Sequence, residues 1–139
     1  MAQGSQPIFY SDLGNPECYL AAERVSSVLG VVAEWEPVLE AELGAAPEEV
    51  DRRAIERLAA ERGLQPLCWP RRWPPDTRLA TLAATYAKQV GRTVAFSLAA
   101  FRQAFAGGRD LSERDTVLIA ASIAAKRPPS AISAIAPNS

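Results

Sequence analysis

The sequence predicts one α/β domain in which a strand–helix–strand unit is followed by a mostly helical second half. Three observations lead to this prediction. The chain has 139 residues, a usual length for a single domain. Two short apolar and aromatic runs near the N-terminus are separated by an amphipathic segment. Hydrophobic residues make up 48% of the chain but aromatic residues only 7%, so alanine and leucine must supply most of the core, and alanine favours helices.

The first strand and helix are predicted near the N-terminus. The apolar run Ile8–Asp12 precedes a turn sequence and is typical of a buried strand. A helix is expected to start at Asn15, a favoured N-cap residue. Pro16 suits its first position, and Glu17 places negative charge near the positive end of the helix dipole. Apolar residues then recur at helical spacing, and Gly30 is expected to end the helix.

The second strand is expected at Val31–Pro37, with Trp35 facing opposite to Glu34 and Glu36. A strand, a helix and a second strand of this length form a βαβ unit. The two strands should therefore be parallel and joined by a right-handed crossover.

Four helices are expected after this unit, over 48–62, 77–90, 94–106 and about 113–126. The last three are predicted to begin behind the N-cap residues Asp76, Thr93 and Ser112, the last in a capping box with Asp115. The first three are expected to end at glycines: Gly63, Gly91 and the pair Gly107 and Gly108. A stripe of phenylalanines is expected to lie in the core: Phe96, Phe101, Phe105.

Two segments are expected to be irregular. Leu64–Pro75 holds four prolines and two tryptophans and cannot form a helix or a central strand. Residues 127–139 are predicted to be a disordered tail, so the domain is expected to span residues 1–126.

Composition excludes several classes of function. The net charge of −1, with acidic and basic residues interspersed, argues against a nucleic-acid partner. No stretch approaches the ~20 apolar residues of a membrane span, and the N-terminus lacks the pattern of a signal peptide, so we expect a cytoplasmic protein. The chain has no histidine, which excludes Ser–His and Cys–His nucleophilic sites and histidine-ligated metals.

The two cysteines are too few for a structural zinc site, and no metal is expected. They lie fifty positions apart, at Cys18 and Cys68, which is not the framework of a secreted disulfide scaffold. A bridge between them is the less favoured alternative.

The first strand-to-helix turn is the candidate functional site, because ligands of βαβ folds gather beyond the strand ends at helix N-termini. The turn Gly14–Leu20, the segment Arg62–Leu64, the Pro/Trp run Trp69–Thr77 and the phenylalanine helix resemble the DsbA-like thioredoxin-fold family. The resemblance is greatest to its cytosolic branches, 2-hydroxychromene-2-carboxylate isomerase and kappa-class glutathione transferase.

That resemblance spans roughly Ile8–Ala125 and implies a thioredoxin-like domain with a helical insert from about residue 45. The family continues into two further strands and a closing helix, one strand beginning with a cis-proline beside the active site. The sequence after Ala125 shows no counterpart of these C-terminal strands.

The resemblance also implies catalytic roles for Asn15 and Cys18. The family turn reads Cys-Pro-x-Cys, or Ser-Pro in the isomerase and transferase, whereas this chain has Asn15 at the first position and keeps only the second thiol, Cys18. Disulfide exchange within the turn needs both sulfurs and is excluded. The Asn15 amide could donate a hydrogen bond to a bound thiolate, or serve only as an N-cap. Cys18 is expected to be an inert, half-buried thiol, with a reactive thiol as the alternative.

Six further residues are candidates for binding a substrate or thiol. Pro16 belongs to the turn itself. Tyr10 and Tyr19 could donate from their phenols, although core packing is favoured for both. Arg71 and Arg72 could hold a carboxylate or remain solvated, and Trp73 could form the wall of a cleft or cover the helical core.

The resemblance, together with the missing first cysteine and the missing counterpart of the C-terminal strands, leaves two functions open. The first is a thiol-dependent isomerase, transferase or oxidoreductase that uses glutathione or another low-molecular-weight thiol and a small-molecule substrate. The second is a non-catalytic interaction domain, or pseudoenzyme, on the same scaffold. A homo-oligomer is expected in either case, because two parallel strands alone leave open edges.

Overall fold

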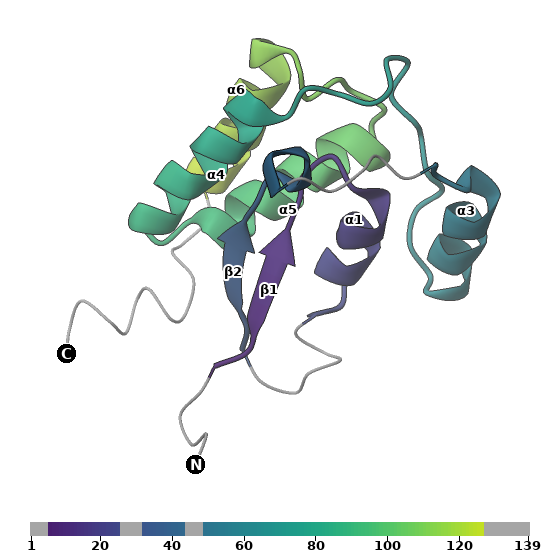
Figure 1. The fold of residues 1–139 in the computed structure, drawn as a ribbon, viewed down its shortest axis with the longest axis horizontal. Helices are drawn as coiled ribbons and strands as arrows, with labels where there is room; N and C mark the ends of the chain where they lie inside the picture. Colours follow the sequence, from purple (N-terminus) through teal and green to yellow (C-terminus); the bar gives the residue numbers. More distant parts are fainter. Residues whose placement is uncertain (1–5, 26–31, 44–48, 127–139) are drawn as a thin grey trace.

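The structure is a computed structural model and describes residues 6–25, 32–43 and 49–126 (Figure 1). Along the chain these residues form β1 (Ile8–Ser11), α1 (Pro16–Ala22), β2 (Glu34–Pro37), the 3₁₀ helix η1 (Glu40–Leu43), α3 (Arg52–Glu61), α4 (Arg78–Gln89), α5 (Thr93–Phe105) and α6 (Arg114–Ala125). The mixed α/β class, with a βαβ-type start and a helical second half, is confirmed.

The sheet has two parallel strands among the described residues, as predicted. Its register pairs Ile8 with Glu34 at one end and Ser11 with Pro37 at the other. Strand β2 is shorter than expected, because it begins at Glu34 and not at Val31. Trp35 is 4% exposed.

The two faces of the sheet differ. On the inner face, Phe9 meets the Trp35 ring edge-on, with ring centres 4.9 Å apart. On the outer face, Lys88 of α4 forms ion pairs with Glu34 and Glu36. The predicted alternation of Trp35 with these two glutamates is therefore confirmed.

Helix α5 lies at the centre of the core. Figure 1 shows it running behind the two strands, with α4 on one side and α1 on the other. The predicted stripe of Phe96, Phe101 and Phe105 is buried. About half of the other buried hydrophobic residues are alanines, whose small side chains let α4, α5 and α6 approach closely.

The predicted starts of the four later helices need correction. Helix α3 begins at Arg52 behind Asp51, whose carboxylate accepts the Ala54 N–H at 3.1 Å, and the predicted start at Glu48 lies outside the described residues. Thr93 and Ser112 do not cap their own helices.

Both hydroxyl groups are used in tertiary contacts instead. The Thr93 hydroxyl donates to the Ala84 carbonyl at 3.1 Å and joins α5 to α4. The Ser112 hydroxyl accepts the Asp76 N–H at 2.9 Å and joins the start of α6 to the start of α4. The predicted cap of α4 is off by one residue: its N-cap is Thr77, which makes no side-chain capping bond, while the Asp76 side chain accepts the Arg78 N–H at 3.1 Å.

Helix α1 is also shorter than predicted, since it ends at Ala22 with Glu23 as its C-cap. The expected continuation to Gly30 falls partly on residues 26–31, which lie outside the described residues, as does the tail at 127–139. Helix η1 was not predicted. The segment 64–77 is irregular as expected, and its Trp73–Pro74 peptide bond is cis. In the described ranges, no helix is long and apolar enough to cross a membrane.

Gly108 is expected to be essential for packing and not only for ending α5. Its φ is +68°, and a Cβ there would lie 2.7 Å from Cys68 Sγ and 3.2 Å from the Cys68 carbonyl oxygen. Gly63 has a φ of +72° but open space around it. We expect Gly108→Ala to lower the free energy of unfolding by about 2–4 kcal/mol, and the control Gly63→Ala by only about 1–2 kcal/mol. Equal losses in urea denaturation would contradict this arrangement.

Candidate functional site

Asp12 organises the turn between β1 and α1. The residue is 8% exposed, and its Oδ1 accepts the Gly14 N–H at 2.8 Å. Its Oδ2 accepts the Glu40 N–H at 3.0 Å. One carboxylate therefore ties the first turn of the chain to the start of η1. The spacing of Asp12 and Gly14 is a common turn signature and could have identified Asp12 from the sequence.

Asn15 caps α1 as predicted. Its Oδ1 accepts the Glu17 N–H at 2.8 Å and the Cys18 N–H at 3.3 Å. Its Nδ2 donates to Glu40 Oε1 at 3.1 Å. The amide group that could hold a thiolate is thus directed at a carboxylate of the same chain. No sequence signal marks Glu40, which lies 25 positions away.

The Cys18 thiol is held in its neutral form. The pKa of Cys18 is raised to about 11. Burial is the largest cause, the nearby carboxylates of Glu40, Asp12 and Glu17 act in the same direction, and a hydrogen bond from the Asp12 backbone opposes them. Cys18 Sγ lies 4.0 Å from the Tyr10 carbonyl oxygen, within reach of a weak S–H hydrogen bond. At neutral pH the group is a thiol, and the thiolate is the reactive form.

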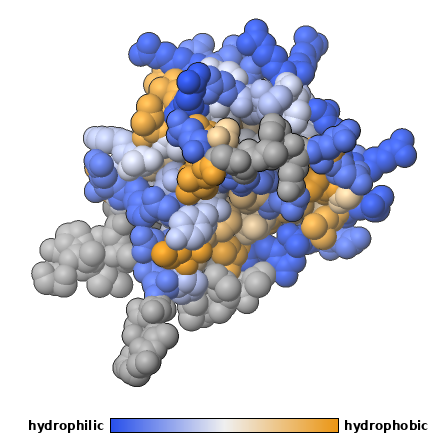
Figure 2. All heavy atoms as spheres, viewed as in Figure 1, coloured by the Kyte–Doolittle hydropathy of each residue, from blue (hydrophilic) through white to orange (hydrophobic). Residues whose placement is uncertain are grey.

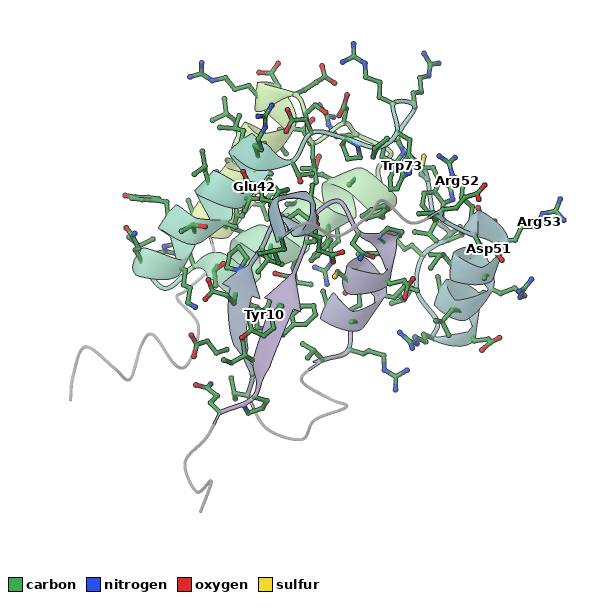
Figure 3. All side chains as sticks on the ribbon, viewed as in Figure 1. Tyr10, Glu42, Asp51, Arg52, Arg53 and Trp73 are labelled. Atoms are coloured by element: carbon green, nitrogen blue, oxygen red, sulfur yellow. The ribbon has the colours of Figure 1, made fainter. Side chains whose placement is uncertain are left out.

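Tyr10 and Pro16 lie beside the turn in different environments. Pro16 is buried at the first position of α1. The Tyr10 side chain is 58% exposed, and Figure 3 shows it in front of the strands. Its backbone carbonyl, and not its phenol, approaches Cys18.

Tyr19 points away from the turn, into the core. Its ring stacks on Phe105 with centres 5.5 Å apart. Burial raises the pKa of the Tyr19 phenol to about 12, and the neighbouring Glu23 carboxylate acts in the same direction. Tyr19 is therefore a core residue, which confirms the favoured prediction for it.

A hollow of about 390 Å³ adjoins Tyr19 and was not anticipated from the sequence. Glu23 and Arg102 in its wall form a two-pronged ion pair, with distances of 2.7 and 2.9 Å. Because these charges neutralise each other, the hollow offers a ligand little net charge. Its lining comes from α1, α5 and the segment after α3: Tyr19, Glu23, Gly63, Leu64, Gln65, Arg102.

The Pro/Trp segment carries the remaining candidates, none of which lines the hollow: Arg71, Arg72 and Trp73. Arg71 and Arg72 are exposed, and Arg72 lies 3.9 Å from the Asp110 carboxylate. The Trp73 ring packs edge-on against Phe105, with centres 6.0 Å apart. Figure 3 shows Trp73 beside Arg52 and well separated from Tyr10. The predicted binding residues therefore do not converge on one site.

Arg52 contacts the two tryptophans of the Pro/Trp segment, which the sequence did not predict. Its guanidinium carbon lies 4.8 Å from the Trp69 ring centre and 5.7 Å from that of Trp73. Trp69 also donates its indole N–H to Glu56 at 2.9 Å. These contacts fasten α3 to the Pro/Trp segment, so the two tryptophans have a structural role there.

The turn carries three carboxylates close to Cys18, those of Asp12, Glu17 and Glu40. Both Cys18 and Cys68 are free, so the alternative disulfide is not formed. Within the part of the chain that the structure describes, no group of three acidic, cysteine or histidine side chains could hold a metal ion.

The cap formed by Asn15 should contribute measurably to stability. We expect Asn15→Ala to lower the free energy of unfolding by about 1–2 kcal/mol, because two N–H groups and the Glu40 carboxylate lose their partner. Asn15→Ser keeps a capping oxygen and should cost less. Urea denaturation of both variants measures the difference, and an unchanged stability in Asn15→Ala would contradict the capping role.

Cys18 should react with a maleimide more slowly than the exposed Cys68 at pH 7. In a Cys68→Ser background, the reaction rate of Cys18 should keep rising with pH up to about 11, because the pKa of Cys18 has that value. Mass spectrometry of the labelled peptides follows both sites. Equal rates in the native protein, or a plateau near pH 7, would show a reactive thiolate at the turn.

Comparison of the chain with protein-family models and with curated proteins found no match in either.

Proposed function

We propose that this chain is a non-catalytic interaction domain built on a thioredoxin-like βαβ scaffold. The observation that carries the proposal is the closed turn at the start of α1. The Asn15 amide is bonded on both sides, to the helix N–H groups and to Glu40. The Asn15 side chain is thereby held by groups of its own chain, and one of its two amide N–H donors is used by Glu40.

The electrostatics of the turn favour the same function. A thiol-dependent isomerase or transferase must stabilise a thiolate, whereas here burial, together with the carboxylates of Glu40, Asp12 and Glu17, raises the pKa of the nearest thiol, Cys18, to about 11. Glutathione carries net negative charge, and its thiolate adds one more. An enzyme using glutathione or another small thiol on a small-molecule substrate is therefore the less favoured function.

The kinship with DsbA-like proteins is part of the proposal. It is supported by the parallel pairing of β1 with β2, by the Asn15–Pro16 helix start at the end of β1 and by the irregular Pro/Trp segment. We further propose a cytoplasmic location, because the two cysteines are free.

Glutathione should leave the thermal stability of the protein unchanged. A ligand at fifty times its Kd would stabilise the folded state by about 2 kcal/mol, a shift of several degrees in Tm. We expect no shift with reduced glutathione up to millimolar concentration, and no acceleration of insulin reduction.

Asn15→Ser supplies the matched control, because it restores the residue that the isomerase and transferase branches have at this position. A rise in Tm with glutathione in the natural chain, lost in Asn15→Ala and kept in Asn15→Ser, would establish a thiol-binding site and overturn the proposal.

A further inference from the structure

Among the described residues the sheet has two strands, and its two edges are protected to different degrees. Strand β2 carries Glu34 and Glu36, ends in Pro37, which has no N–H, and contacts Lys88 of α4. Charges and prolines are the usual means by which proteins block pairing at an exposed edge. Strand β1 has the sequence Ile-Phe-Tyr-Ser and carries no charge. Of the two edges, that of β1 is the one suited to receive another strand.

The backbone groups available at this edge follow from the ladder. The Glu34 N–H donates to the Pro7 carbonyl and the Val38 N–H to the Ser11 carbonyl. Because bonded residues alternate along a parallel ladder, Ile8 and Tyr10 direct their N–H and C=O groups away from β2. The Tyr10 carbonyl lies 4.0 Å from the Cys18 thiol, a weak S–H donor.

The side chains of these two residues are exposed as well. Ile8 is 48% and Tyr10 58% exposed, and both lie on the outer face of the sheet. Figure 2 shows hydrophobic atoms at the surface where the two strands lie in this view. The edge thus combines backbone groups that point outward with apolar side chains that a neighbouring strand would cover.

We propose that β1 pairs with β1 of a second copy of this chain, antiparallel, about a two-fold axis at Phe9. The inference rests on the proposed function, in which the scaffold serves association. In this register Ile8 lies opposite Tyr10 of the second copy, and each pair exchanges both backbone hydrogen bonds. The result is a four-stranded sheet in the order β2–β1–β1–β2.

A second copy fits this edge for reasons of charge and symmetry. A two-fold axis places β1 of one copy against β1 of the other. Strand β1 carries no charged side chain, so the two copies bring no like charges together at this edge. The symmetric register also forms two cross-strand pairs of a β-branched with an aromatic side chain, a favourable combination. Antiparallel pairing closes the assembly at two copies, whereas parallel addition of strands would not.

Paired charge variants test the register. Ile8→Lys with Tyr10→Lys places lysines opposite each other and should weaken the dimer about tenfold or more in sedimentation equilibrium at micromolar concentration. Ile8→Glu with Tyr10→Lys places opposite charges in the same positions and should keep the dimer. Both side chains are exposed in one copy, so circular dichroism should show folded protein in each case. The single variant Tyr10→Lys provides the measurement if a double variant fails to fold.

Leu82→Lys is the matched control, because Leu82 is 68% exposed on α4, in a stripe with Leu79 and Tyr86. It should leave the dimer intact. A monomeric natural chain, a dimer broken by Leu82→Lys and not by the lysine pair, or equal loss in both charge pairs would each overturn the inference. If the natural chain is a monomer and glutathione does not change its Tm, the dimer inference is overturned, but the proposal of a non-catalytic domain still stands.

Discussion

The packing around Phe105 is the constraint on which the rest of the structure depends. This buried ring contacts Tyr19 of α1 and both tryptophans of the Pro/Trp segment, with ring centres 5.5 to 6.0 Å apart. Arg52 of α3 covers the tryptophans from outside. Three segments, α1, the Pro/Trp segment and α3, are thereby gathered around one side chain of α5. Aromatic rings bury much apolar surface in fixed geometries, so this cluster determines where α1 and α3 lie.

The position of α1 in turn determines the chemistry of its N-terminus. With Tyr19 held against α5, the opposite end of the short helix meets η1, where Glu40 accepts from the Asn15 amide. A helix N-terminus ordinarily attracts an anion, and here the chain supplies its own carboxylate. The positive end of the dipole is satisfied internally. Cys18 gains only burial and acidic neighbours, both of which keep it protonated.

The sheet depends on the helices more than they depend on it. Two parallel strands are marginal without further support, and here α4 supplies it through Lys88, which bonds to both outer glutamates of β2. That ion-pair cluster also protects β2 at its outer face. At the edge of β1, among the described residues, the Tyr10 carbonyl lies 4.0 Å from the Cys18 thiol, a weak donor. The asymmetry between the two strands is thus a consequence of which helix lies beside which strand.

The sequence by itself determined the local structure, because its signals act over a few residues. The apolar runs identified β1 and β2, the Asn15–Pro16 pair the start of α1, Gly63 the end of α3, and the phenylalanine spacing the core face of α5. Tertiary structure decided the rest. Thr93 and Ser112 have the chemistry of caps, yet their hydroxyls bond to other helices. Glu40 and Arg52 act on residues 17 or more positions away, across contacts that only folding creates. Whether the turn is an open site or a closed one rested on such contacts, so no local pattern could predict it.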